Sequence, residues 1–321
     1  MQQPEQGLEV FEMTLSCDTI LFSHLIGQNG VAKESLEQAT GAQVLFDALD
    51  VQAKSIIIRS STRHAVEQAY DKLQALMKSL LSSRRILDYN YFLSLPLANP
   101  CTIQHMHDFQ QAVMANPPEG MDDSVFSKGQ HLHLTLSMLK LYSEESRSKA
   151  RLTLQSLSAS IHQLLGNQPL VVRLKGLATF QELDPRSAHV LYMKVQEVGK
   201  GDRLFQLQKL LVAAFREAGL LLPRDNRLNK LHVTVVNTKY RRSPPDTASC
   251  ASTASDVRSQ ERGDRARIPI DASSLLKQQK LNWGKVVLPA IHISERGRFD
   301  LDTGFYACLH SVELPAFPQS Q

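Results

Sequence analysis

The segment HLHLTLSML (131–139) alternates polar residues with leucine and methionine, as a half-buried strand does. His133 and Thr135 stand two residues apart, so in a strand their side chains project from the same face. The segment LHVTV repeats this arrangement with His232 and Thr234. A single His-x-Thr motif occurs by chance in many strands. Two copies in apolar strands, 99 residues apart, predict one site to which two strands contribute.

Each motif presents one imidazole together with one hydroxyl. Imidazole titrates near neutral pH, so one ring could accept a proton while the other donates one to a phosphodiester. The threonine hydroxyls could donate hydrogen bonds to the non-bridging oxygens. We therefore predict that the catalytic residues are His133, Thr135, His232 and Thr234, without a metal or other cofactor. The acid and the base stay unassigned, because neither histidine has an orienting partner near it in the sequence.

Other interpretations of the histidines remain open. A solvated strand face explains either motif taken alone. His131, His133 and His232 could form a three-histidine zinc site, although the two matched threonines would then have no role. His131 shares a strand face with His133 and borders the expected site. His292 precedes Ser294 by two residues in a third, weaker motif, and we interpret it as a strand residue that lines the site.

The segments around the two motifs predict alternating strands and helices. Apolar alternation predicts strands over 86–97, 170–180, 188–197 and 231–240. Helical spacing of apolar residues predicts helices within 99–120, 143–166 and 202–221. This order is typical of an α+β domain, here with two similar lobes.

A different order precedes residue 84. We predict a strand over 8–16, two short helices on either side of GQNG (27–30), two strands, and a long amphipathic helix over 62–83. Glycines at 27 and 30 allow close backbone approach, and the amides that begin the second helix could face phosphate oxygens. A GxxG pair alone is most often only a turn.

The segment HLIGQNGVAKESLEQATGAQVLF (24–46) resembles the type I KH domain. KH domains clamp about four nucleotides of a single strand with the GxxG loop. The resemblance implies that single-stranded RNA, or single-stranded DNA, binds at Gly27, Gln28, Asn29, Gly30 and Lys33. The loop interior holds no basic residue, so a KH module that serves protein contacts remains an alternative.

The paired His-x-Thr motifs resemble those of the two-histidine (2H) phosphoesterase superfamily, and the tail over 281–314 is similar to its closing segment. The resemblance implies two antiparallel sheets around a cleft. It also implies a metal-independent phosphodiesterase that acts on single-stranded RNA ends or 2′,3′-cyclic phosphates. A KH domain followed by a 2H domain resembles a subunit of a nuclear coactivator complex. That resemblance implies a helicase subunit as partner, a nuclear location, and roles in transcriptional coactivation and DNA alkylation repair. A non-catalytic RNA-binding scaffold is the alternative.

Length and charge agree with two domains. The chain has 321 residues, of which 42% are hydrophobic and 21% charged. We place a KH domain at 1–83 and a 2H domain at 84–321. Residues 1–83 hold 6 of the 36 basic and 10 of the 32 acidic residues, a net charge of −4, so the remainder carries +8. Attraction for phosphates should therefore come mainly from the second domain.

The cysteines, the lack of long apolar runs and one polar segment give further expectations. The four cysteines stand far apart, which predicts buried thiols rather than disulfides or a zinc ribbon. No apolar run is long enough to predict a signal peptide or a membrane span. The segment over about 241–267 is rich in serine, aspartate and arginine and predicts a mobile insertion. At its start, Lys239, Arg241 and Arg242 could contact a nucleic-acid backbone.

Overall fold

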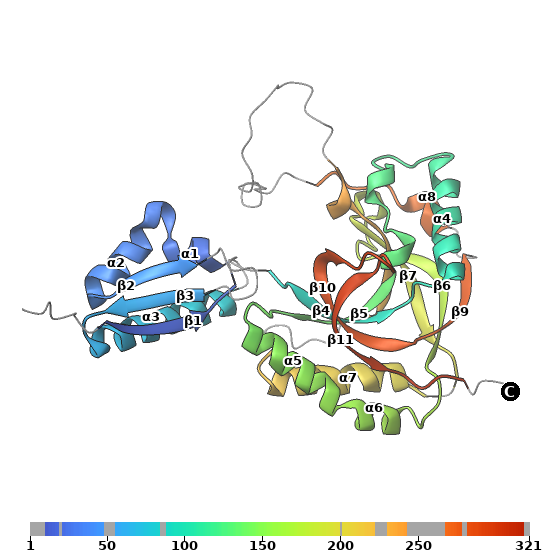
Figure 1. Cartoon of the computed structure of the whole chain (residues 1–321). Coiled ribbons are helices and arrows are strands. Elements are labelled where there is room, and N and C mark those ends of the chain that lie inside the picture. Colours follow the sequence, from blue (N-terminus) through green and yellow to red (C-terminus); the bar gives the residue numbers. More distant parts are fainter. Residues whose placement is uncertain are drawn as a thin grey trace, which may run out of the picture. The chain divides into compact units, whose positions relative to one another are not determined.

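The structure is a computed structural model, and its chain forms two compact units (Figure 1). Unit 1 comprises residues 1–91, 138–153 and 214–226, and unit 2 comprises the remainder. The structure describes residues 10–18, 21–47, 55–83, 88–199, 201–221, 230–242, 267–277 and 281–317. The domain boundary expected near residue 83 adjoins residues 84–87, which lie outside the described residues. Most of the expected insertion, 243–266, also lies outside them.

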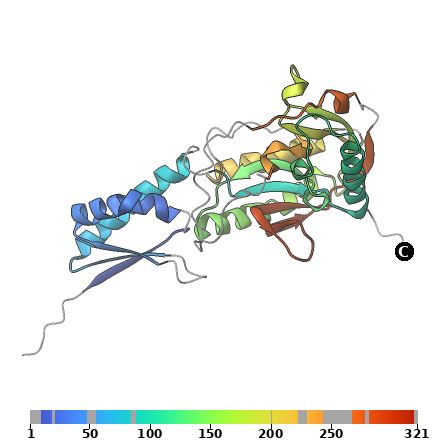
Figure 2. The ribbon, with the colours of Figure 1, turned by 90° about the horizontal axis from the view of Figure 1, so that it is seen from above.

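Unit 1 contains an antiparallel sheet of three strands in the order β1-β3-β2. The strands are β1 (Phe11–Ser16), β2 (Gln43–Asp47) and β3 (Ser55–Ser60), and the helices are α1 (Phe22–Ile26), α2 (Val31–Thr40) and α3 (Arg63–Ser82). The order strand, helix, GxxG, helix, strand, strand, helix is the one expected from the sequence. Figure 2 shows α2 and α3 on one face of the sheet.

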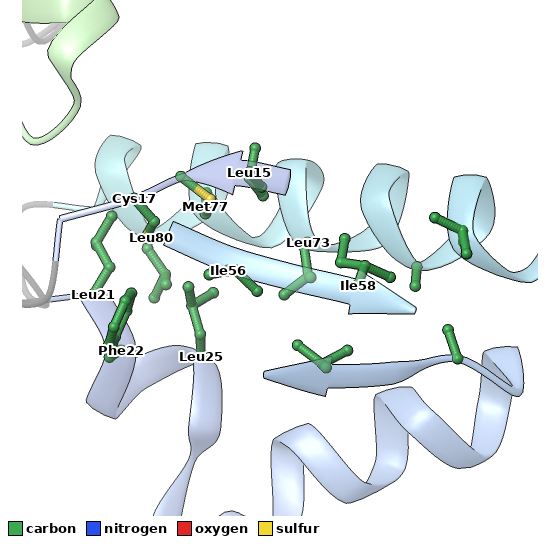
Figure 3. Close-up of a cluster of buried hydrophobic side chains, with 14 of the residues drawn as sticks. Leu15, Cys17, Leu21, Phe22, Leu25, Ile56, Ile58, Leu73, Met77 and Leu80 are labelled. Atoms are coloured by element: carbon green, nitrogen blue, oxygen red, sulfur yellow. The ribbon is translucent and has the colours of Figure 1, made fainter. Parts of the chain in front are cut away.

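The core of unit 1 is the layer between this sheet and its helices (Figure 3). Strand residues such as Leu15 and Ile56 are paired in register and buried together. The apolar stripe of α3, which includes Leu73 and Met77, covers them. Tyr142, from the later segment of unit 1, belongs to the same cluster. Burial of this stripe explains why the amphipathic pattern over 62–83 predicted the helix correctly.

Unit 2 contains two sheets of four strands. The first has the order β11-β10-β4-β5, and the second has the order β8-β7-β6-β9. The first sheet is formed by β4 (Tyr91–Pro96), β5 (His133–Leu139), β10 (Ala290–Phe299) and β11 (Tyr306–Glu313). The second is formed by β6 (Val171–Thr179), β7 (Val190–Glu197), β8 (His232–Asn237) and β9 (Asn282–Val287), all in antiparallel pairs. The expected α+β class with antiparallel sheets is confirmed.

The helices after residue 99 are α4 (Pro100–Met114), α5 (Glu144–Ser156), α6 (Ser158–Leu164), α7 (Arg203–Glu217) and α8 (Ser273–Leu276). The single helix expected over 143–166 is divided at Leu157, whose amide bonds to Leu154 at the tighter three-residue spacing. A buried hydrogen bond from Gln208 Nε2 on α7 to the Leu136 carbonyl ties the helix to β5. None of the described helices is long and apolar enough to cross a membrane.

Candidate functional site

The first motif lies at the start of β5. Leu134 and Leu136 are buried, whereas His133 and Thr135 are half-buried on the other face. His133 donates a hydrogen bond from Nδ1 to the His131 carbonyl at 2.7 Å. Its Nε2 lies 3.1 Å from Thr135 Oγ1, so the imidazole and the hydroxyl of this motif are in direct contact.

The second motif lies at the start of β8 and repeats the orientation of the imidazole but not its contact with the threonine. Val233 and Val235 are buried, and His232 and Thr234 project from the opposite face. His232 Nδ1 donates to the Lys230 carbonyl, also at 2.7 Å. Neither His232 Nε2 nor Thr234 Oγ1 has a hydrogen-bond partner within the described part of the chain, so both are available to a ligand.

In each motif the carbonyl two residues earlier orients the imidazole. A carbonyl oxygen only accepts, so the hydrogen must reside on Nδ1, and Nε2 is the nitrogen that can react. The sequence-based expectation that no local partner exists was wrong, because the partner is the main chain of His131 and of Lys230. A side-chain motif search cannot detect a main-chain acceptor.

The pKa values of both site imidazoles are lowered. Burial lowers the pKa of His133 to about 4, and the charge of His232 contributes to that decrease. Burial also lowers the pKa of His232, with a further contribution from the Lys230 ammonium. Both rings are therefore neutral at pH 7 in the free protein. Because the charge of His232 is one cause of the lowered His133 pKa, protonation of His232 disfavours protonation of His133.

Aromatic rings surround both histidines. The His133 ring centroid lies 5.0 Å from that of Phe92 and 5.3 Å from that of Tyr306. The His232 ring centroid lies 5.1 Å from that of Phe180 and 5.0 Å from that of Tyr192. These rings exclude water from the imidazoles, which is the cause of the lowered pKa values. The positions of these four aromatic residues depend on how distant strands pair, so no local sequence pattern predicts that they surround the histidines.

The neighbouring histidines differ in environment. His131 stacks on Phe299 with ring centroids 4.2 Å apart, so its ring contributes to an aromatic surface while its carbonyl orients His133. His292 is half-buried on β10, and burial lowers its pKa. Its neighbour Ser294 is hydrogen-bonded to Ser94 of β4 at 2.9 Å. Among the described residues, no group of three or more His, Cys, Asp or Glu side chains could hold a metal ion.

The GxxG loop lies in unit 1, between α1 and α2, whereas both His-x-Thr motifs lie in unit 2. Gly27, Asn29 and Gly30 all have positive φ, and Gln28 and Asn29 are exposed. A Cβ on Gly27 would meet the Ala32 Cβ at 2.7 Å, so this position requires glycine. On α2, Lys33 forms an i,i+4 ion pair with Glu37 at 3.7 Å.

The three basic residues after β8 differ in exposure and in their ion pairs. Lys239 and Arg242 are exposed, and neither has an ion pair within the described residues. Arg241 instead forms an ion pair with Asp122 and donates to the Gly120 carbonyl at 2.5 Å. An RNA phosphate would therefore have to displace existing partners at Arg241 but not at the other two.

Two strands that each present a carbonyl-oriented histidine and a threonine form the candidate site. Comparisons with known proteins show the family to which the chain belongs. A family model described as the AKAP7 2′5′ RNA ligase-like domain matches residues 89–314. Since this match covers most of the chain and includes both motifs, the chain belongs to that family.

Curated relatives and solved structures are also similar. Mouse activating signal cointegrator 1 complex subunit 1 is 27% identical over 304 residues, covering 94% of this chain and 83% of the relative. Human A-kinase anchor protein 7 isoform gamma is 26% identical over 168 residues, covering 52% of this chain and 45% of the relative. E. coli LigT with 3′-AMP (16% identity, TM-score 0.37) and Thermus thermophilus TT0787 (14%, TM-score 0.43) are more distant. These structural matches cover 71% of this chain, with 99% of LigT and 100% of TT0787.

Proposed function

We propose that this protein is a metal-independent phosphodiesterase that acts on single-stranded RNA ends or 2′,3′-cyclic phosphates. The observation that carries the proposal is the matched orientation of His133 and His232, each with Nδ1 bonded to a carbonyl. Nε2 is therefore the reactive nitrogen in both rings, and in His133 it contacts Thr135 Oγ1. Membership of a 2′5′ RNA ligase-like family supports RNA as the substrate.

The geometry supports a two-proton mechanism. We assign His133 as the base because its pKa, lowered to about 4, keeps its ring unprotonated, and its Nε2 takes a proton from the attacking water. A phosphate anion bound between the rings favours a proton on His232, which His232 then gives to the leaving ribose oxygen. One P–O bond forms to the water oxygen and one breaks to the ribose. Thr135 and Thr234 donate to the non-bridging oxygens as charge develops on them.

The test uses the metal-free protein with oligonucleotides that end in a 2′,3′-cyclic phosphate or in a 3′-hydroxyl. We expect turnover by the wild type and a loss of at least about 100-fold when His133 or His232 is replaced by alanine. The absence of turnover by the wild type, or undiminished turnover by the double variant, would refute the proposal. His107→Ala, at an exposed position of α4, is the matched control.

For unit 1 we propose a KH domain that holds single-stranded RNA or DNA. The element order, the positive φ values of the loop and its exposed residues support this assignment. Substitution of Gln28 and Asn29 by aspartate would place two negative charges against the phosphates. We expect weaker RNA binding with unchanged unfolding, measured by fluorescence anisotropy and circular dichroism. Unchanged affinity would contradict a nucleic-acid role for the loop.

A second candidate function is a non-catalytic scaffold in a nuclear complex. The similarity to a subunit of the activating signal cointegrator 1 complex over 94% of the chain favours it. We propose a nuclear location, a helicase subunit of that complex as partner, and roles in transcriptional coactivation and DNA alkylation repair. Under this hypothesis His133 and His232 bind an RNA end without cleaving it. Substitution of either histidine should therefore weaken RNA binding, and neither the wild type nor the variants should form product. Co-precipitation of the helicase with the full chain, compared with the loop variant, tests whether unit 1 provides the contact.

A further inference from the structure

Two lysines occupy positions next to His232 in the second sheet. Lys194 on β7 is the register partner of His232 on β8. Cross-strand partners project from the same face, with Cβ atoms about 4.5–5.5 Å apart. Lys230 precedes His232 by two residues, and its carbonyl orients the imidazole. Both lysines are exposed, so their charges are accessible to a ligand that contacts His232.

The ammonium of Lys230 is held beside the site by Tyr192. Its Nζ lies 5.7 Å from the centre of the Tyr192 ring, within the range of a cation–π interaction. Interaction with the buried Tyr192 hydroxyl is the largest cause of a raised Lys230 pKa. The ion pair of Lys230 with Glu182 spans 3.6 Å between exposed side chains, so a phosphate can displace it at little cost.

The corresponding position beside His133 carries no such cation. The residue two before His133 is His131, which is stacked on Phe299 and whose pKa is lowered by burial and by the charge of Lys128. The position two before the second histidine therefore carries a cation, whereas the same position before the first carries an aromatic ring. A substrate with a second anionic group would place that group on the β7–β8 side of the site.

We propose that Lys194 and Lys230 bind the phosphate adjacent to the one on which His133 and His232 act. The preferred substrate is therefore an oligonucleotide with at least two phosphates rather than a cyclic mononucleotide. This inference rests on the proposed phosphodiesterase function and adds a substrate class to it. Lysine binds phosphate as a point charge without demanding one geometry, which suits an RNA of variable sequence.

The test measures equilibrium binding and needs no turnover. The probes are two dinucleotide 3′-phosphates that differ only in their internucleotide linkage, a charged phosphodiester in one and a neutral methylphosphonate in the other. We expect the full-length protein to bind the charged probe about tenfold more tightly, the sum of two modest charge contacts. In Lys194→Ala/Lys230→Ala this preference should disappear, whereas Lys194→Arg/Lys230→Arg should retain it.

Lys209 provides the matched control, because it is a lysine whose Nζ lies 5.6 Å from the Phe205 ring on α7. Lys209→Ala should keep the wild-type preference. The proposal is overturned if the wild type does not distinguish the probes, if the double alanine variant still does, or if Lys209→Ala loses the preference equally. If the double alanine variant loses the preference but the wild type turns over no substrate, the anion site is supported and the catalytic assignment is refuted.

Discussion

At the scale of single residues, the site depends on main-chain atoms as much as on side chains. The carbonyls of His131 and Lys230 fix the tautomer of the following histidine, so substitution of either side chain leaves the orienting oxygen in place. This arrangement ties imidazole orientation to the backbone of the strand. Because only the main chain orients the histidine, the side chain at this position can differ: His131 stacks on Phe299, whereas Lys230 carries a positive charge.

The lowered pKa of His133 predicts a pH-dependent stability. In the unfolded chain the imidazole of His133 is protonated near pH 6.5, whereas in the folded chain it is protonated only near pH 4. Its contribution to the free energy of unfolding is therefore fully present above pH 6.5 and is lost as the pH falls to 4. The difference corresponds to about 3 kcal/mol. We expect His133→Gln to flatten this part of the profile. Urea unfolding followed by the fluorescence of Trp283, the single tryptophan and buried in unit 2, measures it.

The control for this measurement is His107→Gln, at an exposed position of α4. It should leave the slope between pH 4 and 6.5 as in the wild type. If His133→Gln retained the wild-type slope as well, the decrease in stability would have to originate elsewhere in the chain.

Thr234 permits a second residue-scale prediction. Its half-buried hydroxyl faces the site without a hydrogen-bond partner in the described structure. Thr234→Val keeps the shape but removes a donor to the phosphate oxygens, so we expect kcat to decrease about 100-fold. Thr234→Ser keeps the hydroxyl and should retain most of the activity. Equal activity of the two variants on a 2′,3′-cyclic phosphate would remove Thr234 from the mechanism.

At the scale of elements, two glycines of unit 1 have similar φ values but differ in ψ and in their surroundings. Gly27, the first glycine of the GxxG turn, and Gly41, after α2, have φ values of 76° and 69° and ψ values of 172° and 14°. A Cβ at 27 would meet the Ala32 Cβ at 2.7 Å, whereas a Cβ at 41 would meet nothing within 4 Å. The first glycine is therefore required by packing as well as by conformation.

Substitution of each glycine by alanine compares these two positions. Gly41→Ala should cost about 1 kcal/mol, because a residue with a Cβ is strained in the left-handed conformation. Gly27→Ala should cost about 1–3 kcal/mol more, because of the clash and because its ψ of 172° lies in a region that only glycine readily adopts. Hydrogen exchange of residues 11–82, measured by mass spectrometry on the full chain, reports both. Equal protection in the two variants would mean that the loop relaxes around the added methyl group.

At the scale of the whole molecule, positive charge is concentrated after residue 83, where the net charge is +8, against −4 before it. Binding of a single strand that contacts about four phosphates, those at Lys239 and Arg242 included, should weaken with salt, with a log–log slope of about −3. We expect Lys239→Ala/Arg242→Ala to reduce the slope by about 1.4, since both side chains are free to reach phosphates.

Arg241→Ala is the informative comparison for that measurement. Because its guanidinium is bonded to Asp122 and to the Gly120 carbonyl, its loss should lower stability and leave the salt slope nearly unchanged. A larger change in slope for Arg241→Ala than for the double variant would show that RNA displaces the internal partners.

The sequence by itself determined the features that repeat over a few residues. The i,i+2 spacing of His133 with Thr135 and of His232 with Thr234 selected both motifs, because alternation along a strand is a local property. Helical periodicity likewise predicted α3, and the GxxG turn predicted the break between α1 and α2.

Only the tertiary structure decided how these pieces meet. It inserted β4 between β5 and β10, joined β9 to β6, and set Tyr192 and Lys194 opposite Thr234 and His232. It also showed that main-chain carbonyls orient the imidazoles. Strand order and cross-strand partners depend on contacts between residues far apart in the chain, which no local periodicity encodes.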